Sequence, residues 1–417
     1  MTYKKGAGMR GTDVVVTGMG AITPLGTDVP STWEGLLSGR SGIGLMTFPG
    51  HEGDQLARIV AGTMATDPAG LLAPAQARRL DRSQQAALVA TAEAWADAGS
   101  PDVDPERLAS AIGTGIGGVQ TLLAQDDVLE NSGARRVSPR TVPMLMPNAA
   151  AALVSIAYGA RAGSYTPVSA CSSGAEAIAL GARLIRAGEA DVVIAGGTEA
   201  AITPITVAGF QQAQSLSRHA EDPASASRPF AADRNGFVLG EGAAVLVLES
   251  AEHAAARGAH VHGVIAGAGI ASDAHHVTAP APDGRGQVSA MRKALAQAGL
   301  APDRIGHVNA HATGTTVGDA AEAIAIGEVF GRATVTAPKA ALGHLFGAAG
   351  AIEALIAILS VEHAVIPPTR SIGSAGVDPG IDLDVVTERR DLAQHAVLSN
   401  SFGFGGQNVS LVVTRAG

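Results

Sequence analysis

The sequence contains a single cysteine, Cys171, within the stretch VSACSSGAEAIALG at residues 168–181. Small and apolar residues up to Ala170 give way there to a helical pattern, which predicts a strand-to-helix junction at the thiol. If the helix begins at Ser172, its unpaired backbone N–H groups and its dipole favour a thiolate and can hold an oxyanion on a substrate carbonyl. Because most lone cysteines are small buried hydrophobes, a catalytic role for this thiol depends on partner residues elsewhere in the chain.

Two of the twelve histidines stand near glycine-rich turns of a similar kind. His311 lies in NAHATGTTVGD, after an apolar segment, and His344 lies in APKAALGHLFGAAG, at the turn before an alanine-rich helix. Lys339 and Glu353 flank His344 and can pair to hold its turn. We take the two histidines as candidate partners of the thiol, with an ordinary packing role as the alternative for each. The histidines interpreted as surface residues are His253, His260, His363 and His395.

Motifs for metal or dinucleotide chemistry are weak. The chain has no HExxH array, and the adjacent His275 and His276 do not make a metal site, so no bound metal is expected. The segment GMGAITPLG at 18–26 resembles a dinucleotide fingerprint only loosely. It lacks the third glycine at the required spacing, and Pro24 interrupts a helix start.

Composition excludes several classes of protein. Hydrophobic residues make up 46% of the 417 residues, which suits a globular chain with a large core, and the length favours two domains or a duplicated fold. The net charge of -9 argues against a general nucleic-acid binder. A single cysteine excludes an intramolecular disulfide framework and fits a reducing cytoplasm. The basic N-terminal residues lack a long apolar run, so neither a signal peptide nor a membrane-spanning helix is expected.

Apolar runs that end in glycine alternate with helical patterns along the chain. Strands are predicted at 13–17, 190–200 and 243–250 and at the start of 108–118, and a helix is predicted at 83–99. This alternation is typical of α/β folds. Aromatic residues are only 3% of the sequence, so the core must consist of closely packed Ala, Val, Leu and Ile.

The second half of the chain repeats the patterns of the first half in the same order, which indicates an internal duplication. It predicts two packed α/β halves, at 1–258 and 259–417, in which Phe402 would match Phe237. The corresponding segments are 14–24 with 263–273, 111–118 with 305–319, 169–185 with 341–358, and 235–249 with 400–414.

Several motifs together carry a resemblance to a known family: VVVTGMGAITPLG, VSACSSGAEAI, NAHATGTTVGD, APKAALGHLFGAAGAIE and NSFGFGGQN. They resemble the β-ketoacyl-acyl carrier protein synthases, the elongating condensing enzymes of type II fatty acid synthesis in the thiolase superfamily. The resemblance covers essentially the whole chain. It implies a thiolase-like fold, with duplicated α/β halves in an α-β-α-β-α arrangement, and a homodimer joined through the strand before the cysteine. APKAALGH and IDLDVVTE are most similar to actinobacterial members, including ketosynthases that extend very long chains for mycolic acids.

The resemblance implies a catalytic triad made of Cys171, His311 and His344. The acyl chain would be held on the thiol, and the backbone N–H groups of Cys171 and Phe404 would stabilise the oxyanion. The two histidines, as neutral imidazoles, would stabilise the enolate that forms when a malonyl group on the acyl carrier protein loses CO₂. The product would be a 3-oxoacyl chain on the carrier protein, longer by two carbons.

Further roles follow from the same resemblance. Lys339, paired with Glu353, would position the turn of His344 and tune its charge. Phe404, within the glycine-rich GFGG, would act as a gate, with a plain aromatic plug over the core as the alternative. The phosphopantetheine arm of the carrier protein would be held by the hydroxyl groups of Thr313 and Thr315.

The resemblance also implies an apolar acyl tunnel and a basic docking surface. Ile116, Phe210 and Phe402 would contact the acyl chain, and the segment 143–153 would line the tunnel or that of the dimer partner. Carrier proteins are acidic, so a basic patch is expected despite the net negative charge. No cofactor is expected, because the phosphopantetheine arrives on the carrier protein. The candidate docking residues are Arg78, Arg79, Arg82, Arg135 and Arg136.

Three other functions stay open on the sequence. A condensing enzyme of polyketide or very-long-chain metabolism would share the chemistry and differ in pocket depth. A non-catalytic subunit that sets chain length in a heterodimer would have no need of an intact Cys171, His311 and His344. A cysteine hydrolase of α/β-hydrolase type would need a G-x-C-x-G turn, whereas this chain has S-A-C-S-S-G. Decarboxylation of a malonyl thioester separates the condensing enzymes from the hydrolase.

Overall fold

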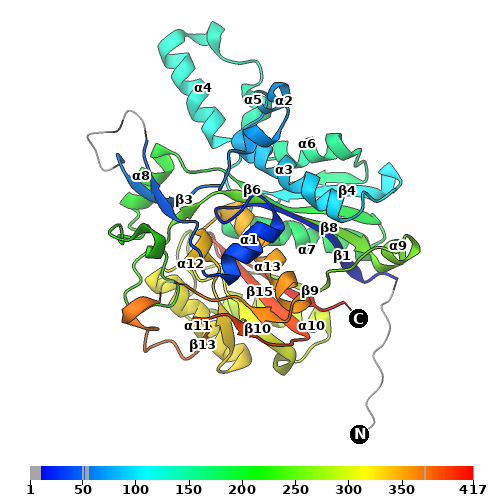
Figure 1. Cartoon of the computed structure of the whole chain (residues 1–417), viewed down its shortest axis with the longest axis vertical. Coiled ribbons are helices and arrows are strands. Elements are labelled where there is room, and N and C mark those ends of the chain that lie inside the picture. The colour runs from blue at the N-terminus through cyan, green and yellow to red at the C-terminus, as the bar shows by residue number, and fades with distance from the viewer. Residues whose placement is uncertain (1–10, 49–50, 52–55, 371, 417) are drawn as a thin grey trace.

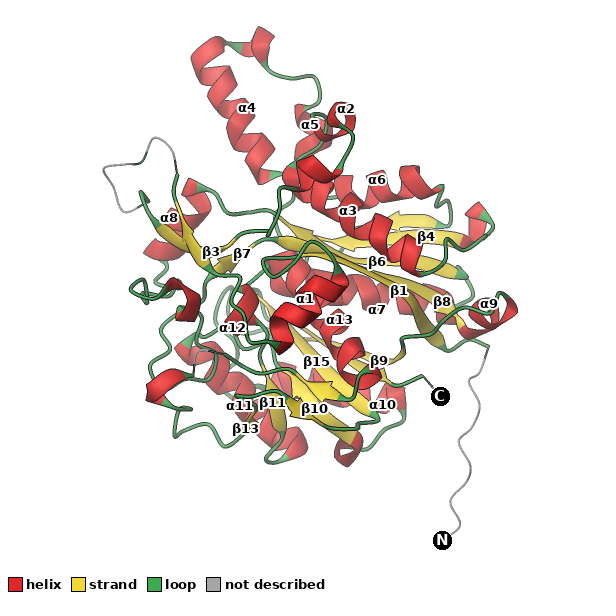
Figure 2. Ribbon diagram, in the orientation of Figure 1, coloured by secondary structure: helices red, strands yellow, loops and turns green. Residues whose placement is uncertain are grey.

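The computed structural model describes residues 11–48, 51, 56–370 and 372–416 (Figure 1). Two sheet layers enclose a central pair of helices, and further helices cover their outer faces (Figure 2). This is the α-β-α-β-α layering that the sequence predicts. The central helices are α7 (Ser173–Arg186) and α13 (Ala349–Glu362), and the outer ones are α3 (Arg82–Asp97), α6 (Ala149–Tyr158), α10 (Arg285–Ala298) and α11 (Thr316–Phe330).

The strands of the two halves join into one continuous sheet of eleven strands within the described residues. The junction is short, because β1 (Val14–Ile22) pairs with β9 (Gly263–Ser272) only at Val15–Val264 and Val16–Gly263. In order across the sheet, the strands are β13 (Asp384–Val385), β11 (Thr334–Thr336), β10 (Ile305–Asn309), β15 (Ala396–Gly403), β16 (Gln407–Thr414), β9 (Gly263–Ser272), β1 (Val14–Ile22), β8 (Gly242–Ser250), β6 (Val192–Glu199), β4 (Leu108–Gly113) and β5 (Gly163–Tyr165).

The glycines that loosely resemble a dinucleotide fingerprint serve helix packing instead. In β1, a Cβ atom on Gly18 would lie 2.1 Å from the carbonyl oxygen of Ala94 in α3, and one on Gly20 would lie 2.0 Å from that of Ala90. Strand β9 makes the same close contact with α10, so the two halves repeat this packing. There a Cβ atom on Gly267 would lie 2.2 Å from the carbonyl oxygen of Ala294, and one on Gly269 would lie 2.0 Å from that of Ala290.

The middle layer explains an unusual sequence pattern. Helix α13 is buried on all sides from Ala349 to Val361, because α7 and both sheet layers surround it. A helix with protein on every side is apolar all round, and AGAIEALIAILSV fits this with one charged residue, Glu353. A buried carboxylate needs a partner, and that requirement shapes the site described below.

One predicted correspondence between the halves is wrong. Phe402 lies in β15, which forms a tight hairpin with β16, whereas Phe237 lies outside the large sheet and bridges to Leu216. The segment 200–241 separates β6 from β8 in the first half and has no counterpart between β15 and β16. The final strands therefore match, but the two phenylalanines do not. The division at 258 and 259 stays a prediction.

Smaller elements complete the fold, and α4 (Val119–Ser132) projects from its body (Figure 1). Residues 1–10, on which the expectation of no leader rests, lie outside the described part. Across that part, none of the helices has the length and apolar character needed to cross a bilayer. The remaining helices and strands are α1 (Val29–Leu37), α2 (Pro74–Ala77), α4 (Val119–Ser132), α5 (Thr141–Leu145), α8 (Pro204–Gln212), α9 (Ala251–Ala256), α12 (Lys339–Leu342), β2 (Gly44–Met46), β3 (Ile59–Gly62), β7 (Leu239–Gly240), β12 (Val365–Ile366) and β14 (Arg390–Asp391).

Candidate active site

Cys171 lies in a tight turn, Ala170–Ser172, that leads directly into α7. Ala170 adopts a left-handed conformation with a φ of 52°, which costs a non-glycine residue about 1–2 kcal/mol. The two serines after the cysteine stabilise this turn. The Ser172 hydroxyl donates to the carbonyl of Ser169 at 2.8 Å, and the Ser173 hydroxyl donates to that of Ala170 at 2.7 Å. The Ser-Ser pair thus fixes the backbone that carries the thiol.

The surroundings of the thiol favour its protonated form. Burial raises the pKa of Cys171 to about 12, and the Lys339 ammonium and a hydrogen bond from the backbone N–H of Phe404 oppose this shift only in part. The sequence predicted a thiolate from the position at a helix N-terminus. In this structure the cost of desolvating a thiolate opposes that expectation.

His311 follows β10 and is held by a buried glutamate. The carboxylate of Glu322, in α11, accepts the backbone N–H of His311 at 2.8 Å and that of Ala312 at 2.7 Å. Asn400, from the NSFGFGG motif in β15, donates to the same carboxylate at 3.1 Å. Burial raises the pKa of Glu322 to about 7, although these hydrogen bonds oppose the shift. The loop that presents His311 is therefore fastened to two other elements.

His344 is fixed through its backbone. Its N–H donates to the carbonyl of Val238 at 2.7 Å, and its own carbonyl accepts the N–H of Gly240 at 2.8 Å. Its ring lies edge-on to that of His311, with the centroids 5.4 Å apart and an interplanar angle of 84°. Its buried Nδ1 has no hydrogen-bond partner among the described residues. The ring is therefore placed by packing and by its backbone hydrogen bonds.

Lys339 joins His311 to α13. Its ammonium forms a buried ion pair with Glu353 and lies 3.3 Å from Nδ1 of His311. Because an ammonium can only donate, Nδ1 of His311 accepts, and the ring proton resides on Nε2. Burial, and then the charge of Lys339, holds the pKa of both His311 and His344 well below 6.5. Both imidazoles are therefore neutral hydrogen-bond donors.

Phe404 stands at the tip of the turn between β15 and β16, where its side chain is 39% exposed. The preceding Gly403 allows that turn to approach the nucleophile closely. A Cβ atom there would lie 2.3 Å from the carbonyl oxygen of Ser169 and 3.3 Å from the backbone nitrogen of Cys171. The turn therefore brings the backbone N–H of Phe404 beside the thiol of Cys171, and the role of these N–H groups in holding an oxyanion stays a prediction.

A cavity of about 350 Å³ brings the predicted residues together. Cys171, His311 and His344 all line it, whereas Lys339 and Glu353 lie outside the lining. The hydroxyl groups of Thr313 and Thr315, which also line the cavity, lie 3.1 Å apart. The other predicted residues in the lining are Thr313, Thr315, Phe402 and Phe404.

Two predicted substrate contacts lie outside this cavity. The ring of Phe210 stacks on Phe346, with the centroids 5.4 Å apart, so it contacts the cavity through that residue. Ile116 is 41% exposed at the surface and does not line the cavity of the single chain. The segment 143–153 includes the half-exposed end of α5 and the start of α6.

Sequence reasoning missed two acidic residues in α11. Besides Glu322, Asp319 accepts the N–H groups of Thr313 at 3.0 Å and Gly314 at 3.1 Å, and of Phe230 at 2.8 Å. The available signal was TVGDAAEAIAIG, in which two acids three residues apart interrupt an otherwise small and apolar helix. Residues at that spacing share one helix face, and here that face is directed at the backbone of the His311 loop.

The basic residues proposed for docking fall into two classes. Arg82 forms ion pairs with Glu241 at 2.6 Å and with Asp67 at 2.7 Å, so its charge is used within the chain. A docking role for Arg82 stays a prediction, although its charge is already paired inside the chain. The exposed candidates lie after α2, at Arg78 and Arg79, and after α4, at Arg135 and Arg136.

Comparison with known proteins now identifies the family. Residues 11–254 match the beta-ketoacyl synthase N-terminal domain, and residues 262–373 match the C-terminal domain of that family. The chain belongs to the beta-ketoacyl synthase family. Among its relatives, the 3-oxoacyl-[acyl-carrier-protein] synthase 2 of Mycobacterium tuberculosis (strain ATCC 25618 / H37Rv) is 46% identical over 406 residues, which are 96% of this chain and 97% of the relative.

Solved structures agree with this ketosynthase in fold. A beta-ketoacyl synthase from Burkholderia phymatum is 34% identical and aligns with a TM-score of 0.88 over 97% of this chain and 100% of that one. The ketosynthase complex titled AntDE:AntF, a type II PKS acyl-carrier protein with its ketosynthase bound to the hexaketide, gives a TM-score of 0.87 at 28% identity, over 97% and 99% of the two chains. The predicted thiolase-like fold of this ketosynthase is confirmed.

Proposed function

We propose that this ketosynthase catalyses the decarboxylative condensation of malonyl-acyl carrier protein with an acyl chain held on Cys171, and thereby elongates fatty acids. The observation that carries the proposal is one cavity lined by a buried thiol and two neutral imidazoles. A relative that is 46% identical over nearly the whole length bears the name 3-oxoacyl-[acyl-carrier-protein] synthase 2, which supports the reaction class.

In the first step, the sulfur of Cys171 attacks the thioester carbonyl of an acyl-carrier protein. A C–S bond forms to Cys171, and the backbone N–H groups of Cys171 and Phe404 stabilise the negative oxygen of the tetrahedral intermediate. Collapse breaks the bond to the carrier's phosphopantetheine sulfur. The thiol proton of Cys171 ends on that leaving sulfur, so the exchange needs no net proton from solvent.

In the second step, the malonyl thioester carbonyl accepts hydrogen bonds from His311 and His344. Loss of CO₂ leaves an electron pair on the α-carbon, and the two imidazoles stabilise the enolate oxygen because they donate without carrying a charge of their own. The α-carbon then attacks the acyl carbonyl on Cys171. The new C–C bond forms and the C–S bond breaks, so Cys171 leaves as a thiolate and the product leaves as 3-oxoacyl-carrier protein. The thiolate takes up one proton from water, which regenerates the thiol.

Lys339 acts as a positioning residue in this proposal. Its ammonium donates toward Nδ1 of His311, which leaves the Nε2 proton free to face the substrate. Its ion pair with Glu353 anchors it to α13. The enzyme needs no prosthetic group of its own, because the reactive thiol of the substrate is supplied by the carrier's phosphopantetheine.

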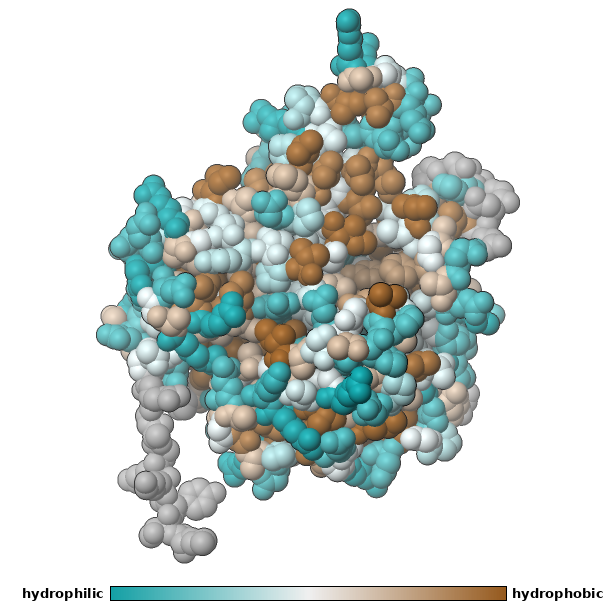
Figure 3. Space-filling model, turned by 180° about the vertical axis from the view of Figure 1, so that it is seen from behind, coloured by the Kyte–Doolittle hydropathy of each residue, from teal (hydrophilic) through white to brown (hydrophobic). Residues whose placement is uncertain are grey.

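We further propose that the enzyme is a cytoplasmic homodimer that docks carrier protein on exposed arginines. Apolar side chains gather near the base of the projecting α4 segment (Figure 3), and β5 is the edge strand of the large sheet. A partner copy that covers this face would bury these side chains and extend the sheet. Size-exclusion chromatography with light scattering should give twice the chain mass. The exposed residues are Leu122, Leu129, Val142, Met146 and Ile156.

The test of the main proposal is mass spectrometry of the intact protein after incubation with acyl-carrier proteins of increasing chain length. We expect one acyl mass on the native protein and none on Cys171→Ala. Addition of malonyl-carrier protein should then release a 3-oxoacyl product and CO₂. If the native dimer accepts no acyl group, the proposed function fails. Preference for very long or polyketide chains in the same assay would instead point to those pathways.

A further inference from the structure

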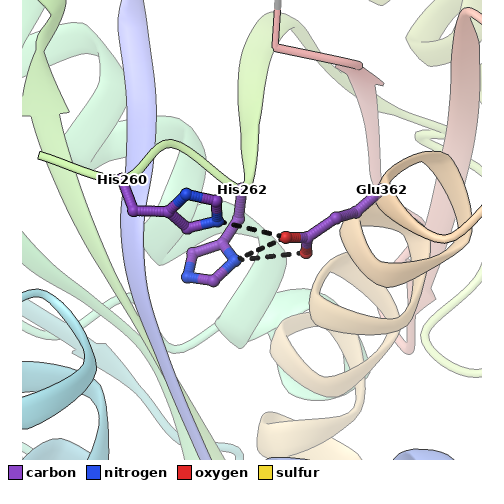
Figure 4. A group of neighbouring side chains, drawn as sticks. All are labelled: His260, His262 and Glu362. Atoms are coloured by element: carbon purple, nitrogen blue, oxygen red, sulfur yellow. Dashed lines mark hydrogen bonds and ion pairs between the residues drawn. The ribbon is translucent and has the colours of Figure 1, made fainter.

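A cluster of metal-ligating side chains lies away from the active-site cavity, on the far end of α13. His260 and His262 precede β9 in an extended segment, so their side chains, two residues apart, share one side of the chain. Glu362 is the last residue of α13 and points toward both rings (Figure 4). The three residues come from segments separated by 100 positions, which is why no local sequence motif announces them.

The geometry fits a small divalent ion. Oε1 of Glu362 lies 3.3 Å from Nε2 of His260 and 3.1 Å from Nδ1 of His262. All three ligand atoms lie within 4.8 Å of one another. Ligands bound to tetrahedral zinc at about 2.0–2.2 Å are separated by roughly 3.4 Å from each other. An ion can therefore enter between these atoms with only small movements of the side chains.

The surroundings support a metal ligand role for His262. Its other ring nitrogen, Nε2, lies 3.0 Å from Oδ2 of Asp97, and this carboxylate is fixed in turn by the backbone N–H of Met19 at 2.9 Å. A carboxylate on the far nitrogen is the usual way in which proteins orient a metal-bound imidazole. Here it directs Nδ1 of His262 toward Glu362 and His260.

The cluster is also open to an incoming ion. His260 is 69% exposed, whereas the side chains of His262 and Glu362 are 12% and 23% exposed. His262 and Glu362 line a cavity of about 790 Å³ that Trp33 also lines. One ligand is thus exposed at the surface and two lie in the wall of a cavity, which leaves room for a water molecule as a fourth ligand.

We propose that His260, His262 and Glu362 bind one divalent transition-metal ion, best matched by Zn²⁺, with water completing a tetrahedral site. Two imidazoles and one carboxylate suit Zn²⁺ or a similar ion, whereas Mg²⁺ and Ca²⁺ prefer oxygen ligands alone.

The ion would join separate parts of the fold. His262 contacts Asp97 at the end of α3 in the first half, and Glu362 ends α13 in the second. A ligand that binds only the folded chain stabilises it by mass action. Zinc should therefore raise the melting temperature of the full-length protein, and a chelator should reverse the change.

The experiment is a titration of chelator-treated, tag-free full-length protein with Zn²⁺ by calorimetry and with Co²⁺ by visible absorption. It is run in the Cys171→Ala background, because the active-site cavity also holds a thiol and two imidazoles. We expect one ion per chain, a tetrahedral Co²⁺ spectrum and no binding of Mg²⁺. His260→Ala and Glu362→Gln should each weaken binding at least about tenfold. His395→Ala, which removes an exposed histidine elsewhere, should leave binding unchanged.

Two results would overturn the proposal. Zn²⁺ that binds the native chain but not Cys171→Ala belongs to the active-site cavity. Binding that persists with equal affinity in both His260→Ala and Glu362→Gln comes from other surface groups. Because His260 is mostly exposed, its alanine variant should fold normally, and its melting temperature without metal should equal that of the parent. Its zinc-dependent rise in melting temperature should be absent.

Discussion

The turn that carries Cys171 has a counterpart in the second half of the chain, and the two turns have almost the same backbone. Ala170–Ser172 leads into α7, and Phe346–Ala348 leads into α13, each through a short 3₁₀ turn. The first residue of each is left-handed, with φ values of 52° and 44°. Gly347 therefore occupies the position that Cys171 occupies in the first turn.

The surroundings give the two turns different tasks. A Cβ atom on Gly347 would lie 2.4 Å from the backbone nitrogen of Gly115, and the N–H of Gly347 donates to Glu199 at 3.1 Å. No side chain fits there, so the second turn is a wall, and its Phe346 lines the active-site cavity. Cys171 faces the cavity itself. The same local geometry thus supplies a nucleophile in one half and a structural support in the other.

The largest expected effects are on catalysis, and they differ between the two turns in the reaction step that is lost. Cys171→Ala should accept no acyl group and should lose at least about 10³-fold in condensation, since the nucleophile is gone. His344→Ala, two residues before the second turn, should still accept the acyl group. Its condensation rate should fall by about 10²–10³-fold because one hydrogen bond to the enolate is lost. Acyl loading by mass spectrometry and CO₂ release measure the two steps.

His395→Ala is the control for this pair, because it removes an exposed histidine far along the chain from either turn. Equal loss of acyl loading in the Cys171 and His344 variants would contradict the assignment of Cys171 to acyl loading and His344 to condensation. So would normal condensation in His344→Ala with a native far-UV spectrum, because the proposed enolate contact would then be unnecessary.

Much of this arrangement could be predicted from the sequence. The glycine-rich strand ends and the matching helices predicted the duplication, because close packing of strands and helices demands small residues at fixed places. The motifs around Cys171, His311 and His344 predicted a shared site. The turns before α7 and α13 were located correctly, because a few neighbouring residues determine where a turn lies. The Lys339–Glu353 pair follows from one charged residue in an otherwise apolar buried helix.

Other features depend on distant contacts that no local pattern contains. The thiol was expected to ionise, but its burial depends on how the surrounding elements close over it. Arg82 looks like a surface residue until Glu241 and Asp67 are brought beside it. Phe402 and Phe237 lie in similar sequence motifs but at different places in the fold, because the segment 200–241 has no equivalent in the second half.

The second prediction concerns the proton on the thiol. If the turn alone set its reactivity, Cys171 would ionise readily at a helix N-terminus. Burial instead raises its pKa to about 12, so the thiolate fraction below that pH should rise about tenfold per pH unit. The rate of alkylation by iodoacetamide, followed by mass spectrometry, should therefore increase from pH 7 to pH 9 without a plateau, at roughly tenfold per unit. A small thiol peptide should level off in the upper part of a range extended to pH 10. A plateau below pH 8 in the protein would show that the helix N-terminus lowers the pKa of Cys171 more than burial raises it.

The third prediction tests whether the two turns support each other. A Cβ atom on Gly174 would lie 2.8 Å from the carbonyl oxygen of Gly347, and one on Gly350 would lie 2.7 Å from the backbone nitrogen of Ala175. The lack of a side chain at Gly174 thus leaves room for the turn before α13, and at Gly350 it leaves room for helix α7. Gly174→Ala and Gly350→Ala should each lower the free energy of unfolding by about 1–3 kcal/mol in urea denaturation, because overpacking must shift backbone.

Gly327→Ala in α11 is a matched control for these two variants. It is also a helical glycine, but a Cβ atom there would meet nothing within 4 Å. Its alanine variant should be neutral or more stable by up to about 1 kcal/mol, because alanine favours helix. A large loss of stability at only one of Gly174 and Gly350 would mean that the packing of the two turns is not reciprocal.

The smallest expected effect comes from the left-handed residue at the start of the first turn. Ala170→Gly should relieve about 1–2 kcal/mol of backbone strain and should lose about 0.4–1 kcal/mol through the greater entropy of the unfolded chain. The net result should be a gain of roughly 0.5 kcal/mol in the free energy of unfolding. Ala170 is the better site for this test, because Phe346 has the same conformation but also stacks on Phe210. A loss of more than about 1 kcal/mol in urea denaturation would show that the methyl group of Ala170, and not its backbone, decides the stability of the nucleophile turn.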